Sequence, residues 1–154
     1  MATVKSPIRI GAHVPTSGGM ATRSIEYALT IKAEAIQVFA SSPRTWATST
    51  PNPAMDEAFK IKTAEHDIKP YVHASFLINL GSPTQSTYEN SLSATAYSLK
   101  RGREIGAHGV VVHTGSAVEE SHVKQAWKQI HEGVMPIINN LKDDDSWLLL
   151  EPTA

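Results

Sequence analysis

The chain alternates short apolar, β-branched runs with longer stretches of helical periodicity, and this alternation limits the folds open to it. Five runs are too short for helices and are predicted to be strands: residues 8–14, 35–41, 69–75, 109–115 and 147–151. Strands separated by helices are expected to be parallel, because consecutive parallel strands need a long crossover. Their near-continuous apolar character predicts a sheet covered on both faces. The sequence therefore predicts an α/β fold.

Four helices are predicted between these strands. The first follows a pair of glycines at 18–19, and an Asn-Pro pair at 52–53 marks the start of the second. A capping box, Ser86-x-x-Glu89, is expected to open the third helix, which ends at Gly106. Pro136 predicts a kink or a break in the fourth.

The absence of a phosphate-binding glycine motif after any strand favours a (β/α) barrel over a nucleotide-binding open sheet. A complete eightfold barrel takes about 250 residues, whereas this chain has 154. We therefore expect one domain over residues 1–154, with five parallel strands and four helices. It would form the N-terminal part of a TIM (β/α)8-type barrel whose C-terminal strands are absent.

Composition excludes several kinds of chemistry. The chain has no cysteine, which rules out disulfides, thiolate nucleophiles and Cys-type zinc sites. Its formal net charge is −1, so no overall basic field indicates a nucleic-acid partner. Neither a signal-peptide core nor a run of about 18 apolar residues is present. We expect a cytoplasmic protein that makes no contact with a membrane.

Metal-binding side chains stand where three of the predicted strands give way to loops: His73, His113 and Glu151. The ligand site of a parallel α/β fold gathers at the C-terminal ends of its strands, so these residues are expected to lie side by side. Two imidazoles and a carboxylate suit Zn²⁺ or Mn²⁺. His13 holds the equivalent place on the first strand, where a ligand and a packing role remain equally open.

Four segments together resemble the endonuclease IV family: "IGAHVPTSGGMATRSIEYA", "YVHASFLINLGSP", "VVVHTGS" and "LLLEPTA". These are metal-dependent apurinic/apyrimidinic endonucleases of base excision repair, with a xylose isomerase-like TIM barrel and up to three zinc ions. The resemblance implies hydrolysis of the phosphodiester on the 5′ side of an abasic site in double-stranded DNA. It also implies that His73 and His113 bind one metal and that the catalytic carboxylate of Glu151 bridges two, with the remaining ligands beyond Ala154.

The resemblance also extends to residues that contact DNA. It implies that Arg44, in "SSPRTW", enters the minor groove and that Phe76 and Leu77 form a wedge between bases. The structural alternative for Phe76 and Leu77 is that both side chains pack beneath the following helix. Three positions depart from the usual family pattern: Thr45 where Gln is frequent, Phe76 where Tyr is usual, and Pro152 where Asn is usual.

Two other functions remain open on the sequence alone. A metal-dependent sugar isomerase or epimerase would have a related barrel, although the "SFLINLGSP" segment and Arg44 favour DNA. A non-catalytic half-barrel that binds DNA or a partner is the other. An arc of five strands would leave its edges unpaired, which predicts self-association or pairing with a complementary half-barrel.

Overall fold

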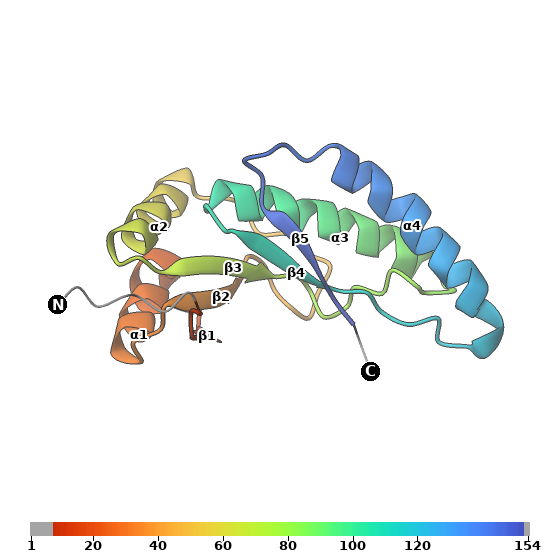
Figure 1. Ribbon diagram of the computed structural model, residues 1–154, viewed down its shortest axis with the longest axis horizontal. Coiled ribbons are helices and arrows are strands. Elements are labelled where there is room, and N and C mark those ends of the chain that lie inside the picture. Colours follow the sequence, from red (N-terminus) through yellow and green to blue (C-terminus); the bar gives the residue numbers. More distant parts are fainter. Residues whose placement is uncertain (1–7, 153–154) are drawn as a thin grey trace.

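Five parallel strands lie in sequence order across one sheet in the computed structural model, which describes residues 8–152 (Figure 1). The strands are β1 (Gly11–His13), β2 (Ala35–Phe39), β3 (Lys69–His73), β4 (Gly109–His113) and β5 (Trp147–Glu151). Four of the five predicted strands overrun these bounds. The first does so by three residues at its start and one at its end, and the next three by their last two residues. Each strand thus ends on a ring-bearing or acidic side chain.

Helices connect the strands as predicted. They are α1 (Ile25–Thr30), preceded by the π-helical segment η1 (Gly19–Ser24), α2 (Pro53–Glu65), α3 (Gln85–Glu104) and α4 (Val123–Asn139), preceded by the 3-10 turn η2 (Glu120–His122). Figure 1 shows α2, α3 and α4 along the same side of the twisted sheet. Alternating strands and helices with parallel pairing throughout give the α/β architecture predicted from the sequence.

One face of the sheet is the core of the molecule. Its branched side chains are at most 1% exposed: Ile36, Val38, Val72, Val110 and Val112. The strand register places Val38 beside Val72 and Val72 beside Val110, so these side chains form a continuous layer. Helix residues pack onto this layer, among them Phe59 of α2, Leu99 of α3 and Val134 of α4.

The opposite face of the sheet is only partly covered among the described residues. Gln37, Tyr71, Val111 and Leu149 are half-buried there, and Trp147 is 72% exposed. The expectation that both faces are covered is therefore wrong for residues 8–152. All the helices lie on the other side, and this second face is the one that points inward in a closed barrel.

A buried ion pair joins α2 to α3. The guanidinium of Arg101 donates to both carboxylate oxygens of Asp56 at 2.8 Å, and the two residues are 4% and 5% exposed. Glu104 also accepts from Arg101 Nη1, at 2.5 Å. Hydrogen bonding to Asp56 raises the pKa of Arg101 above its ordinary value, against the lowering effect of burial. Arg101 therefore stays charged inside the helix layer.

The predicted capping box of α3 and the predicted break at Pro136 are wrong, while the alternative of a kink at Pro136 stays a prediction. The capping box does not form, because α3 begins at Gln85 with Thr84 as its N-cap, and the Gln85 side chain instead donates to Glu89. Pro136 does not break α4, which continues to Asn139. Only one turn follows the proline, and the Asn140 side chain donates to the Pro136 carbonyl at 2.9 Å.

None of the helices within residues 8–152 is both long and apolar enough to traverse a lipid bilayer.

Candidate metal centre

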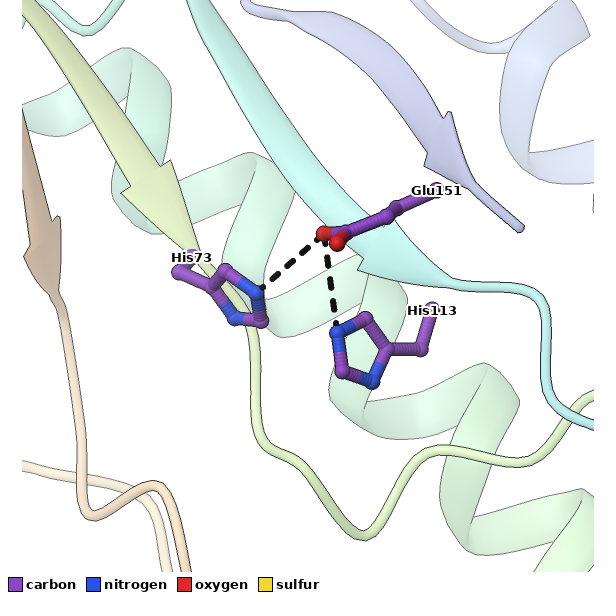
Figure 2. Close-up of side chains that lie close together, drawn as sticks. All are labelled: His73, His113 and Glu151. Carbon is purple, nitrogen blue, oxygen red and sulfur yellow. Dashed lines mark ion pairs between the residues drawn. The ribbon is translucent and has the colours of Figure 1, made fainter. Parts of the chain in front are cut away.

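His73, His113 and Glu151 converge at the C-terminal ends of β3, β4 and β5. The register pairs His113 directly with Glu151 and pairs His73 with Val111, two residues before His113 on the same face. Figure 2 shows the three side chains pointing toward one another from three neighbouring strands. One candidate ligand atom from each of the three residues lies within 4.8 Å of those from the other two.

The separations within this cluster fit a shared cation. Nε2 of His73 and Nε2 of His113 each lie 3.5 Å from Oε2 of Glu151. Nitrogen and oxygen ligands of one tetrahedral zinc, with bonds of about 2.0–2.2 Å, lie about 3.3–3.5 Å apart. Ordinary hydrogen bonds are shorter, about 2.9 Å. Two imidazoles and a carboxylate are donors that suit Zn²⁺, and Mn²⁺ also accepts them.

A backbone contact prepares His73 for such a role. Its Nδ1 lies 2.8 Å from the carbonyl oxygen of Ala74, and a carbonyl can only accept a hydrogen bond. This contact favours the tautomer in which Nδ1 carries the proton, which leaves Nε2, on the side of Glu151, as the atom that could bind a cation. Fixing the tautomer of a histidine by its second nitrogen is typical of metal ligands in proteins.

Aromatic rings surround the two histidines. The ring of Phe76 lies 5.2 Å from that of His73 and 5.9 Å from that of His113, between centroids. Phe39 lies edge-on to His73 at 5.5 Å and to Phe76 at 5.2 Å. The rings thus restrict the orientation of His73 and replace water beside it. Sequence reasoning missed Phe39, although its position as the last residue of β2, paired with His73, was a usable signal.

Arg44, Phe76 and Leu77 lie on loops at the same end of the sheet as the cluster. Arg44 is exposed in the loop after β2, while Phe76 and Leu77 are 49% and 37% exposed after β3. The carbonyl of Pro43 joins the two loops, since it accepts from Phe76 N at 2.9 Å and from the Ser75 hydroxyl at 3.1 Å. Phe76 packs on the histidine rings and stays half exposed. Its contact with DNA remains a prediction.

His13 lies outside the cluster. Its ring lies 4.4 Å from that of Phe39 at an interplanar angle of 50°, and its Nδ1 lies 3.1 Å from the Gln37 side-chain oxygen. This geometry favours the packing role of the two left open by the sequence.

A further histidine, His108, stands at the opposite end of the sheet, just before β4, with its ring 6.1 Å from that of Tyr71. Burial, with a smaller contribution from Lys69 and Arg9, lowers the pKa of His108 below its ordinary value.

The fold and the cluster define a class of protein: part of a parallel (β/α) barrel with a His-His-Glu group at its strand ends. Comparison with known proteins identifies the family within this class. Residues 25–154 match the sequence model of the family described as xylose isomerase-like TIM barrel. A probable endonuclease 4 from Streptomyces coelicolor is 49% identical over 146 residues, which cover 94% of this chain and 50% of that protein. The chain spans about half the length of the curated relatives it matches.

Solved structures agree with this assignment. The crystal structure of endonuclease IV from Thermus thermophilus has a TM-score of 0.74 and 30% identity, covering 95% of this chain and 52% of that chain. A D-tagatose 3-epimerase-like protein, with a TM-score of 0.67 and 15% identity, shares the fold.

The chain thus belongs to the xylose isomerase-like TIM barrel family. The expected resemblance to endonuclease IV and the expected partial TIM barrel are both confirmed.

Proposed function

We propose that this chain provides the first metal-binding part of an abasic-site endonuclease that hydrolyses the phosphodiester 5′ to the lesion in base excision repair. The observation that carries the proposal is the cluster of His73, His113 and Glu151, with both nitrogen–oxygen separations at 3.5 Å. It occurs in a chain 49% identical to a protein named probable endonuclease 4. Double-stranded DNA with abasic sites, inside the cell, is the proposed substrate.

The chain's own residues would hold a cation in defined ways. His73 and His113 would each offer a neutral Nε2, and Glu151 would offer Oε2. Zn²⁺ is the proposed ion, with Mn²⁺ as the alternative, and when bound it supplies a Lewis acid that activates water and neutralises charge on phosphate. The second oxygen of Glu151 would be available to another cation, in line with the bridging role that the family resemblance implies. Three protein donors suffice for one ion, so further ions need further groups.

The exposed loop residues give the proposal its DNA-binding part. Phe76 and Leu77 present an apolar surface beside the cluster, which suits insertion between unstacked bases at a lesion. Arg44 places a positively charged guanidinium on the adjoining loop, where a narrow minor groove would attract it. The alternative of a sugar isomerase or epimerase has support from fold alone, since the epimerase-like neighbour is only 15% identical.

The partly covered face of the sheet is a proposed association surface. On this face of β5, one of the two edge strands among the described residues, Trp147 is 72% exposed and Leu149 is half-buried. A second copy or a complementary half-barrel would cover such apolar side chains and pair the free strand edge. Sedimentation that shows a cooperative, compact monomer at micromolar concentration would contradict this association.

Incision of a labelled duplex with one tetrahydrofuran abasic analogue tests the function. We expect the chain to bind one zinc ion and, once loaded, to bind this duplex more tightly than an undamaged one. Glu151→Gln should remove the zinc, whereas Glu120→Gln, which changes an exposed carboxylate in the 3-10 turn η2, should retain it. A single cut 5′ to the lesion supports the endonuclease, and preferential binding without a cut supports the non-catalytic half-barrel. Turnover of a ketose or aldose instead of DNA would overturn the proposal.

A further inference from the structure

Asn79 connects the loop that carries Phe76 and Leu77 to the loop that follows His113. Its side-chain oxygen accepts two backbone hydrogen bonds. One comes from Gly81 N in its own loop at 3.0 Å, and the other comes from Ser116 N in the loop after β4 at 2.9 Å. These bonds use both lone pairs of the amide oxygen. One side chain therefore holds together two segments that are 37 residues apart.

Two glycines allow this close approach, one from each loop. A Cβ on Gly115 would lie 2.1 Å from the Asn79 side-chain oxygen and 2.6 Å from its Cα, and Gly115 has φ +78°. A Cβ on Gly81 would lie 3.0 Å from the Ser116 carbonyl oxygen. The glycines of the "LINLGSP" and "HTGS" segments thus face the opposite loop, which explains why both segments contain one.

Side chains of α3 and α4 also anchor the loop around Asn79. The backbone N–H of Asn79 donates to the hydroxyl of Ser91 on α3, and Gln129 of α4 donates to the carbonyls of Leu80 and Ser82. Ile78 and Leu80 are 3% and 0% exposed, whereas Phe76 and Leu77 remain at the surface. The loop is thus anchored on its inner side and presents its apolar tip outward.

We propose that Asn79 is a positioning residue that sets the place of the Phe76–Leu77 tip relative to the metal ligands. His113 is followed after three residues by Ser116, and Phe76 is followed after three residues by Asn79, so the link fixes both short segments at one point. A wedge separates bases productively only if the lesion then meets the cation, because misplacement of about 1 Å is costly. This inference rests on the proposed function for its effect on DNA.

Native-state hydrogen exchange by NMR tests the link itself. In Asn79→Ala the amides of Gly81 and Ser116 should exchange at least about tenfold faster, the effect of losing one hydrogen bond. The Val110 amide in β4 should be unchanged. Asn79→Asp keeps an acceptor oxygen and should restore protection. Equal protection of Gly81 and Ser116 in Asn79→Ala, or faster exchange of all amides alike, would overturn the positioning role.

Binding measurements on the zinc-loaded chain test the consequence. Asn79→Ala should lower the preference for a tetrahydrofuran duplex over an undamaged duplex by about tenfold and leave zinc affinity within about twofold. Gly115→Ala, which separates the loops by bulk, should do the same, and Asn139→Ala on exposed α4 should do neither. Unchanged preference in Asn79→Ala would contradict the inference. A wild-type chain without any preference would overturn the proposed function, and the exchange of Gly81 and Ser116 would then decide the link alone.

Discussion

Replacing Asp56 by alanine is expected to be among the most damaging single changes outside the sheet. It would leave the guanidinium of Arg101 buried without its bidentate partner. Removing one member of a buried pair costs about 3–5 kcal/mol. Glu104 would still accept from Arg101 Nη1, so we place the loss at the lower end, about 3 kcal/mol. This is a large fraction of the 5–15 kcal/mol, in rough terms, that stabilises a typical domain.

Urea unfolding at pH 7, followed by circular dichroism, measures this loss. Glu57→Ala is a matched control, because that carboxylate pairs with Lys60 on the exposed surface of α2 and should contribute about 1 kcal/mol or less. The double variant Asp56→Leu with Arg101→Met replaces the pair by apolar side chains and should recover to within about 1 kcal/mol of the wild type.

Two results would refute this reasoning. If Asp56→Ala unfolds within about 1 kcal/mol of the wild type, the pair is not desolvated as its burial indicates. If the double variant is as unstable as Asp56→Ala alone, then geometry specific to the ions, rather than an uncompensated charge, accounts for the loss.

Three further predictions concern histidines and one interhelical hydrogen bond. Zinc should raise the unfolding temperature of the wild type and of His131→Ala, an exposed α4 variant, but not of His113→Ala; an equal rise in all three, by scanning calorimetry, would place the ion elsewhere. Tyr88 donates its hydroxyl to a backbone carbonyl of α4 at 2.8 Å, so Tyr88→Phe should lose about 1 kcal/mol of unfolding free energy in urea, and no loss would mean that water replaces the contact. The pKa of His108 is lowered in the folded state, so the unfolded state binds more protons as pH falls through the ordinary value of 6.5 toward the folded pKa. The free energy of unfolding should therefore decrease as the pH falls over that interval and should not change above it. In urea titrations from pH 7.5 to 5, His108→Gln should reduce this dependence of unfolding free energy on pH. An unchanged dependence would contradict the assignment to His108.

The strands were predictable because short apolar, β-branched runs alternate with stretches of helical periodicity along the sequence. A strand such as β4 has no competing local signal, so its existence and parallel pairing follow from the helices on either side. The cover of the second face was not predictable in the same way. Whether Tyr71 or Leu149 is buried depends on what packs against the sheet from outside these elements, and short-range patterns contain nothing about it.

The candidate site divides similarly. His73, His113 and Glu151 could be brought together on paper because parallel strands place their C-terminal ends at one rim. Their surroundings could not, since Phe39 looks like any apolar residue at the end of a strand. The role of Asn79 is also invisible in sequence, because a side chain that accepts two amide protons is defined only by the approach of a distant loop.

The spacing of the three candidate ligands determines how metal binding would depend on folding. Each comes from a different strand, separated by 40 positions between the histidines and by 38 to the glutamate. A disordered polypeptide offers these three groups no nearby chelating partner among themselves, so a cation bound by them gains full affinity only once β3, β4 and β5 have docked. If the three residues bind a cation as proposed, its occupancy would therefore report that β3, β4 and β5 have assembled.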